Sequence, residues 1–187
     1  MSKDKEIRFL GSYAANTSVV SEVIGKLIKD LSKVGYSEEE TFEIAISMDE
    51  TISNAIKATI ENEKQTAETL YITIRYVVSE TEFDATIIDH GSGFDFAQTL
   101  SDTPNSASDD YHDQIMNYGI RKDKSTSSMV NKGISLKGIG AGLKIILNFM
   151  DSVSVDYIDK KDIIASNVTE STDGTIFNIK RERRNFS

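Results

Sequence analysis

The stretch SEEETFEIAISMDETISNAIKATIE, residues 37–61, decides the fold. It opens with Ser37-Glu38-Glu39-Glu40, which has the form of a capping box, where Ser37 and Glu40 satisfy free N–H groups at a helix start. Its acidic residues also lie at the positive end of the helix dipole. The pattern predicts a helix from about residue 38 to about residue 61. Its apolar stripe consists of Ala45, Met48, Ile52, Ala55 and Ile56.

Upstream of this helix, the sequence predicts a short strand over residues 6–13 and a first helix. Asn16 or Thr17 is placed to cap that helix, and Gly35 lies just past its expected end. The apolar residues recur with the periodicity of a helix that buries one face. They are Val20, Val23, Ile24, Leu27, Ile28 and Leu31.

Downstream, β-branched and aromatic residues predict strands over residues 69–78 and 83–88, joined as a hairpin. A polar stretch of more than forty residues follows, up to about Lys137. We expect a third helix from near Gly140, and then strands over residues 152–158, 163–168 and 174–180. The predicted fold class is α/β: a two-layer sandwich with helices on one face of a mixed, mostly antiparallel sheet, in a single domain over residues 1–187.

Composition excludes several classes of function. Thirty acidic residues against twenty-one basic ones give a net charge of −9, which disfavours nucleic acid as a partner. The sequence has no cysteine, so it has no disulfide, thiolate metal site or cysteine nucleophile, and its two histidines, His90 and His112, make a multi-histidine metal site improbable. No apolar run is long enough to cross a membrane and no apolar signal segment follows Met1, so we expect a cytoplasmic protein.

The first motif with chemical potential lies in the helix itself. Glu50, Asn54 and Lys57 follow one another at i, i+4 and i+7, so they share one face, roughly opposite the apolar stripe. The amide oxygen of Asn54 is a suitable ligand for Mg²⁺, and the carboxylate of Glu50 is a suitable proton acceptor. Taken alone, this motif is more simply interpreted as a solvated polar face.

The second motif is Asp89-His90-Gly91-Ser92-Gly93, at the end of an apolar strand. Gly91 and Gly93 allow the backbone to turn and a flat ligand to come close, and a buried Asp89 needs a partner such as the amine of adenine. An ordinary turn after a strand is the simpler alternative.

The third motif, KGIGAGLK over residues 137–144, is a glycine-rich turn that runs into a helix. Free N–H groups at a helix start bind phosphate, although a flexible lead-in to a core helix is the alternative. The spacing fits neither a Rossmann fingerprint nor a Walker motif. In a fourth motif, Asp173-Gly174-Thr175, the hydroxyl of Thr175 is placed to hydrogen-bond a ligand ring, although a simple turn is the more common explanation. The candidate residues of the third motif are Lys137, Gly138, Gly140, Gly142 and Leu143.

In this order, the four motifs resemble the GHKL ATPase superfamily, over about residues 37–180. Within it, the chain looks most like the serine/threonine kinases that act as anti-sigma factors in bacterial partner switching. The resemblance implies a Bergerat-type ATP-binding fold, ATP and Mg²⁺ as cofactors, and a long ATP lid at about residues 95–137. It implies roles for Glu50 as the base that acts on a serine, Asn54 as the Mg²⁺ ligand and Asp89 as the adenine ligand.

The same resemblance implies that Gly91 and Gly93 line the adenine site with support from Thr175, and that Gly138, Gly140 and Gly142 hold the phosphates. Lys57 and Lys137, or Lys132, are then expected to screen phosphate charge. The implied partners are an antagonist protein of the STAS type, which carries the phosphoacceptor serine, and a sigma factor. A homodimer is also implied.

Three alternatives remain at this point. The chain is alternatively a nucleotide-gated binding protein with little or no phosphoryl transfer, or the ATPase module of a sensor histidine kinase. Asn54-Ala55-Ile56-Lys57 is close to the corresponding motif of those histidine kinases. The third alternative is a structural α/β domain with chance glycines.

Overall fold

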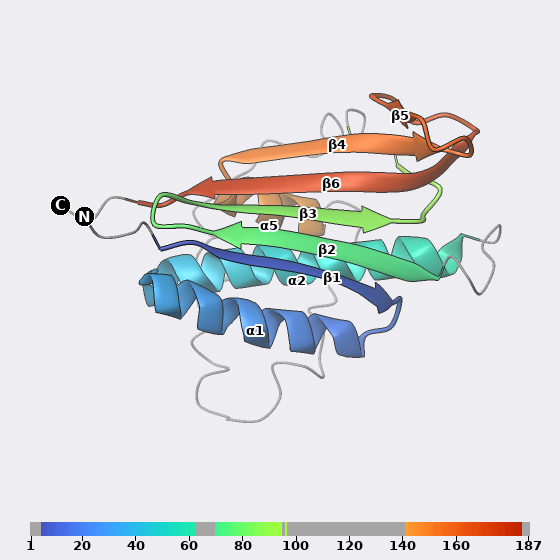
Figure 1. The fold of residues 1–187 in the computed structure, drawn as a ribbon. Helices are drawn as coiled ribbons and strands as arrows, with labels where there is room; N and C mark the ends of the chain where they lie inside the picture. Colours follow the sequence, from blue (N-terminus) through green and yellow to red (C-terminus); the bar gives the residue numbers. More distant parts are fainter. Residues whose placement is uncertain (1–4, 63–69, 95, 97–140, 185–187) are drawn as a thin grey trace.

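In a computed structural model, residues 5–62, 70–94, 96 and 141–184 are described, and they form a sheet covered by helices (Figure 1). The sheet of the described residues has six strands, and every neighbouring pair is antiparallel. In spatial order these strands are β1 (Ile7–Ala14), β2 (Tyr71–Val78), β3 (Glu82–Asp89), β6 (Thr172–Glu182), β4 (Ser152–Asp159) and β5 (Ile164–Ala165).

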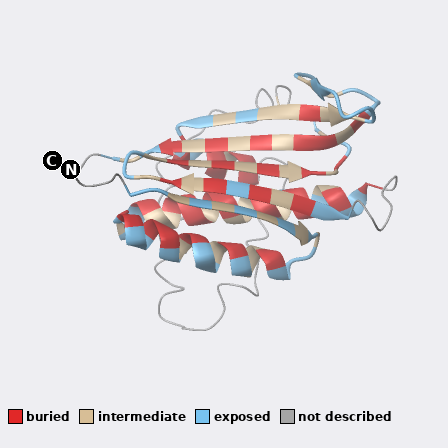
Figure 2. Cartoon of the chain, in the orientation of Figure 1, coloured by how far each residue is buried: buried red, intermediate tan, exposed pale blue. Residues whose placement is uncertain are grey.

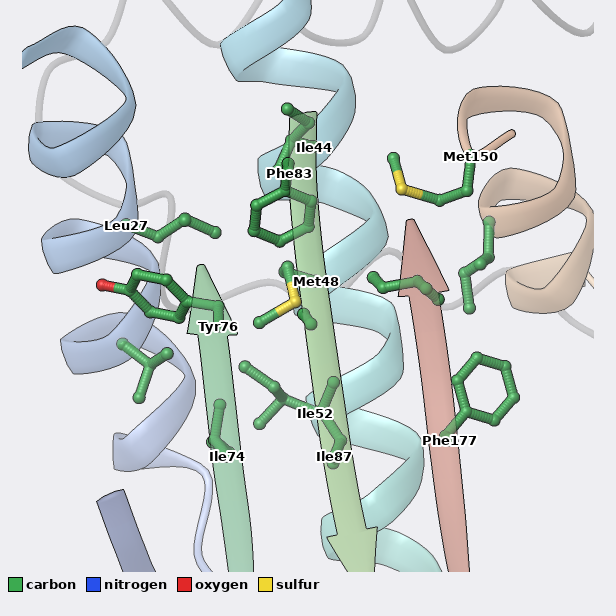
Figure 3. Close-up of a cluster of buried hydrophobic side chains, with 14 of the residues drawn as sticks. Leu27, Ile44, Met48, Ile52, Ile74, Tyr76, Phe83, Ile87, Met150 and Phe177 are labelled. Carbon is green, nitrogen blue, oxygen red and sulfur yellow. The ribbon is translucent and has the colours of Figure 1, made fainter. Parts of the chain in front are cut away.

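Three helices of the described residues lie side by side on one face of this sheet (Figures 1 and 3). They are α1 (Ser18–Val34), α2 (Glu38–Glu61) and α5 (Ala141–Phe149). The central helix α2 packs between the other two, so its residues contact both helices and the sheet. The arrangement confirms the predicted two-layer α/β sandwich.

The core lies between the helix layer and the sheet. Met48 and Ile52 of α2 are fully buried, and they face Ile74 and Ile87 of the central strands (Figure 3). Along β2 and β3, buried side chains alternate with partly or fully exposed ones, as expected for a sheet that packs on one face only (Figure 2). Removing such a buried side chain typically costs about 2–5 kcal/mol, so this core fixes α2 against the sheet.

Local signals account for the helix boundaries. The capping box at the start of α2 is complete: Ser37 Oγ accepts a hydrogen bond from the Glu40 N–H at 3.2 Å, and the Glu40 carboxylate accepts one from the Ser37 N–H at 3.2 Å. Gly35 ends α1 with φ of 95°, a left-handed conformation that suits glycine. Thr17 is the N-cap residue of α1, but Asn16 supplies the capping oxygen, which accepts from the Ser18 N–H at 3.0 Å.

Two predictions about the sheet need correction. It is wholly antiparallel among the described strands rather than mixed, because the two strands of each of the five neighbouring pairs run in opposite directions. The strand predicted over residues 163–168 is limited to Ile164–Ala165. It lies at the sheet edge and pairs with β4 alone, so its β-branched residues lack a second partner strand.

No helix in the described parts of the chain is both long and apolar enough to cross a membrane. The polar stretch predicted as a lid, residues 95–137, lies outside the described residues except for Phe96.

Candidate functional site

The first part of the site is built where β3 ends. Asp89, the last residue of β3, is 6% exposed, and its Oδ1 accepts hydrogen bonds from the Gly91 N–H at 2.7 Å and the Thr175 hydroxyl at 2.9 Å. Burial raises the pKa of Asp89 to about 6, and these hydrogen bonds oppose the shift. The result is a buried carboxylate, fixed in position, that can accept a hydrogen bond from a ligand amine.

The glycines around Asp89 leave no room for side chains. A Cβ on Gly91 would lie 2.7 Å from Ala58 Cβ and 2.9 Å from Asp89 Oδ1. Gly93 has φ of 76°, and a Cβ there would lie 2.9 Å from Thr172 Cγ2. Both positions therefore require glycine because neighbouring side chains pack directly against their backbone. Gly93 also requires it because its backbone has a left-handed conformation.

Gly174 belongs to the same arrangement, although the sequence analysis assigned a role only to its neighbour Thr175. A Cβ on Gly174 would lie 2.7 Å from the backbone oxygen of Asp89, so glycine lets β6 approach β3 closely beside the carboxylate. The signal was present, since Gly174 lies within the Asp173-Gly174-Thr175 motif. We refer to Asp89, Gly91, Gly93, Gly174 and Thr175 as the strand-end group.

The end of α2 holds the backbone next to Asp89, a role that the sequence analysis missed. Thr59 Oγ1 accepts a hydrogen bond from the His90 N–H at 3.2 Å, and Asn62 Nδ2 donates one to the His90 carbonyl at 2.8 Å. Both side chains are buried. An asparagine just after a helix is a common helix-end signal, but its long-range partner is not visible in the sequence.

Tyr157 of β4 holds the chain a few residues further on. Its hydroxyl donates a hydrogen bond to the Phe94 carbonyl at 2.7 Å and accepts one from the Phe96 N–H at 3.3 Å. Tyr157 is 4% exposed. The backbone that follows Gly93 is thus fixed by β4, which lies two places from β3 in the sheet, and sequence periodicity cannot indicate such a contact.

The second part of the site, which we call the helix-face group, consists of Glu50, Asn54 and Lys57 on α2. Asn54 Nδ2 donates a hydrogen bond to Glu50 Oε1 at 3.1 Å, and Lys57 Nζ lies 4.0 Å from the carboxylate of Glu61. Asn54 and Lys57 are exposed, whereas Glu50 is partly buried. The three residues do share a face of the helix, but the Glu50 end of this face is covered rather than solvated.

Burial raises the pKa of Glu50; the Asn54 hydrogen bond opposes this shift, and the neighbouring charge of Asp49 adds to it. The covering element is the start of α5, because a Cβ on Gly142 would overlap the carboxylate of Glu50. Gly142 therefore gives Glu50 its space, and the third sequence motif meets the first.

The two groups lie along a common wall, the helix α2. Ala58, the residue after Lys57, lies against Gly91 of the strand-end group, and Gly142 lies against Glu50, a little more than two turns earlier on the helix. The structure thus brings Glu50, Asp89 and Gly142 to one helix from three separate segments. The exposed Asn54 and Lys57 lie between these contacts along α2.

The remaining predicted residues differ in what the structure describes. Leu143 is 7% exposed and packs in the core, so its side chain anchors α5. Lys132, Lys137, Gly138 and Gly140 lie outside the described residues.

The arrangement fits a purine nucleotide. The strand-end group provides a buried hydrogen-bond acceptor, Asp89, next to glycines at which a side chain would not fit. The helix-face group adds an ammonium and an amide along the same helix, α2. Among the described residues, no cluster of three or more histidine, aspartate or glutamate side chains is arranged to hold a metal ion. The exposed amide of Asn54 carries an oxygen of the kind that hard cations such as Mg²⁺ bind together with water.

Comparison with known protein families agrees with this geometry. Residues 14–165 match the family described as the histidine kinase-like ATPase domain. This match covers most of the chain, and the chain therefore belongs to that family, within the GHKL superfamily. No curated protein is significantly similar to it in sequence. The family identifies the chain as an ATP-binding module of the ATPase and kinase type.

Proposed function

We propose that this protein is an ATP-dependent protein serine/threonine kinase, an anti-sigma-factor-like regulator that phosphorylates a serine of a STAS-type antagonist protein. The observation that carries the proposal is the placement of Glu50. It is a partly buried carboxylate with a raised pKa, held by Asn54 and lying against the start of α5. A raised pKa makes this carboxylate a stronger proton acceptor than an ordinary exposed glutamate.

In this proposal, Asp89 and Thr175 bind the adenine ring, and Gly91 and Gly93 let it approach. Asn54 Oδ1 is the one protein ligand of Mg²⁺, and Lys57 screens phosphate charge together with Lys137 or Lys132. When bound, Mg·ATP supplies the phosphoryl group that is transferred. Gly138, Gly140 and Gly142 are proposed to hold the phosphates at the start of α5.

The chemical task of the chain is then proton transfer and positioning. Glu50 accepts the proton of the serine hydroxyl while that oxygen forms its bond to phosphorus and the bond to ADP breaks. Asn54 Nδ2 orients the carboxylate through the 3.1 Å hydrogen bond to Oε1. The neighbouring acid, Asp49, projects about 100° away around the helix, so it is the poorer base.

The test is phosphoryl transfer from γ-labelled ATP to a co-purifying protein, with nucleotide affinity measured separately by calorimetry. Glu50→Gln keeps the size and the hydrogen bond of the side chain, so we expect unchanged nucleotide affinity and transfer reduced by about 100-fold or more. Asp49→Asn is the matched control and should transfer normally. Unchanged transfer by Glu50→Gln would remove Glu50 from the role of base.

The same assay separates this proposal from its alternatives. Binding of Mg·ATP by the wild-type chain without transfer to any protein would favour a nucleotide-gated binding protein. Label that appears on a histidine would favour the module of a sensor histidine kinase. The cytoplasmic location, the sigma-factor partner and the homodimer are part of the proposal and are tested by isolating the complex from cells.

A further inference from the structure

A buried arginine connects three elements at the end of the molecule opposite Asp89. The guanidinium of Arg181, on β6, forms an ion pair with Glu43 Oε2 on α2, and both side chains are 1–2% exposed. Its Nη1 donates a hydrogen bond to the Phe149 carbonyl, the last residue of α5, at 2.6 Å. One side chain thus ties α5 to α2 and both to the sheet.

The helices α2 and α5 meet a second time two helical turns away, where Glu50 lies against Gly142. Glu43 and Glu50 are seven residues apart on α2, and Gly142 and Phe149 are seven residues apart on α5. Seven residues are close to two turns, about 10 Å of rise, so each pair lies on one face of its helix. The helices α2 and α5 are therefore antiparallel and meet at two points, Glu50 with Gly142 and Glu43 with Phe149 through Arg181.

Stability alone does not account for the arginine. A buried ion pair contributes little net stability, because desolvation offsets the attraction between the charges. In addition, Glu43 Oε1 is buried and has no hydrogen-bond partner among the described residues. Arg181 does provide a fixed geometry: its planar guanidinium binds the Glu43 carboxylate and the Phe149 carbonyl at the same time, so it fixes their relative positions.

The carbonyl that Arg181 binds belongs to a helix end. The last carbonyls of a helix lack partners within the helix, and a cation there is favoured by the helix dipole. The helix α5 has only nine residues, so fixing Phe149 also limits how the other end can tilt or slide. At that other end, Gly142 lies against Glu50.

We infer that Arg181 is a positioning residue for phosphoryl transfer, which holds α5 so that its first turn stays against Glu50. The inference rests on the proposed kinase function. It goes beyond that function because it assigns a role to a buried residue that contacts neither Glu50 nor any residue of the strand-end group.

The first test is Arg181→Lys. A single ammonium keeps the charge opposite Glu43 but cannot hold the carboxylate and the Phe149 carbonyl in a fork. We expect the fold and the nucleotide affinity to be retained and the transfer rate to fall by about 10- to 100-fold, as a misplacement of about 1 Å does. Arg184→Lys is the matched control: Arg184 Nη2 lies 3.6 Å from the same Glu43 oxygen but is exposed, so transfer should not change.

The second test replaces the pair with apolar residues. Glu43→Leu combined with Arg181→Met removes both charges, and such replacements often leave a protein as stable as before. If Arg181 positions α5, this double variant melts like the wild type but still transfers slowly. If the double variant has both wild-type stability and wild-type transfer, Arg181 has only a structural role and the inference is wrong.

A third measurement does not depend on kinase activity. The chain has no cysteine, so Ile60→Cys and Asn148→Cys introduce unique sites for spin labels on exposed positions of α2 and α5. Because α5 runs antiparallel to α2, Asn148 lies level with about Ile44, and Ile60 is then about 25 Å further along the axis of α2. Adding Arg181→Lys should broaden or shift the distance distribution, whereas an unchanged distribution would overturn the inference. A wild-type chain that transfers no phosphate would instead overturn the proposed function and leave this measurement valid.

Discussion

The strand-end group and the helix-face group differ in how firmly their side chains are held. Asp89 and Thr175 are buried, bonded to each other and surrounded by backbone that α2 and β4 hold in place. Asn54 and Lys57 are exposed; Asn54 donates one hydrogen bond to Glu50, and Lys57 lies 4.0 Å from the carboxylate of Glu61. Under the proposed function, this difference predicts that the strand-end group is already fixed for base recognition in the absence of nucleotide, whereas Asn54 and Lys57 adjust when phosphate binds.

Glu50 is intermediate between the two groups, because its side chain is partly buried rather than buried or exposed. The absence of a side chain at Gly142 gives its carboxylate room, and Asn54 is its hydrogen-bond partner. Glycine thus leaves room for a neighbouring element in both groups: at Gly91 for Ala58 of α2 and the Asp89 carboxylate, and at Gly142 for the Glu50 carboxylate.

The largest expected effect comes from Gly142→Ala. The added methyl group would overlap the Glu50 carboxylate, so the carboxylate must move, and we expect transfer to fall on the order of 100-fold. Gly25→Ala on α1 is the control, since a Cβ there meets nothing within 4 Å and alanine should stabilise the helix by about 0.5–1 kcal/mol. Transfer rates and melting temperatures of both variants decide the matter. Normal transfer by Gly142→Ala would show that Glu50 does not need its present position.

The next largest effect concerns Asp89→Asn. Loss of a charge-assisted hydrogen bond to the ligand should weaken nucleotide binding about 30-fold, or about 2 kcal/mol. The free energy of unfolding should stay the same or rise at pH 7.5, because the amide has no buried charge to desolvate. Calorimetry and chemical unfolding measure the two quantities. A variant that binds normally would exclude Asp89 as the base-recognition group, and one that is strongly destabilised would give it a structural role.

A change of pH should produce a smaller effect through the same residue. The pKa of Asp89 is about 6 in the folded chain, so at pH 5 about one tenth of the carboxylate is ionised and nucleotide affinity should be about tenfold lower than at pH 7.5. Stability should change in the opposite sense. Because this pKa is above the ordinary value of 3.8, the folded state binds the proton more tightly, and the stability from Asp89 is lost as pH rises through 6.

Asp89→Asn is also the control for this measurement, since it retains His90 and the other titrating groups. Its nucleotide affinity should be nearly independent of pH between 5 and 7.5. If the variant keeps the tenfold pH dependence of the wild type, another group causes it.

The sequence predicts the local features of the fold and the site, but not the contacts between distant segments. The capping box at Ser37, the apolar stripe of α2 and the position of Asp89 at a strand end follow from local patterns, and the structure has them. The contact of Gly142 with Glu50 and the bond of Asn62 to His90 do not follow, because they join segments that lie 92 and 28 residues apart. Periodicity shows which face of an element is apolar, but not which residue of another element meets its polar face.

The ion pair of Arg181 with Glu43 marks the limit of sequence reasoning most clearly. Charged residues are almost never fully buried unless they are paired, so composition gives no reason to place either residue in the core. Glu43 also follows closely on the acidic residues Glu38, Glu39 and Glu40 of the first helical turn, so it does not stand out in the sequence. The two charges meet because α2 packs against the face of the sheet on which Arg181 of β6 lies, next to the end of α5.

The smallest expected effect is that of Tyr157→Phe, which tests whether the firm part of the site extends past Gly93. The hydroxyl bonds both Phe94 and Phe96, so its loss should cost about 1 kcal/mol of stability and speed hydrogen exchange at the Phe96 amide. Tyr71→Phe is the control, because that ring packs edge-on against His90 and is 39% exposed. If both variants change exchange at Phe96 equally, the hydroxyl of Tyr157 does not fix this backbone. If only Tyr157→Phe speeds this exchange, the firmly held backbone of the strand-end group extends to Phe94 and Phe96.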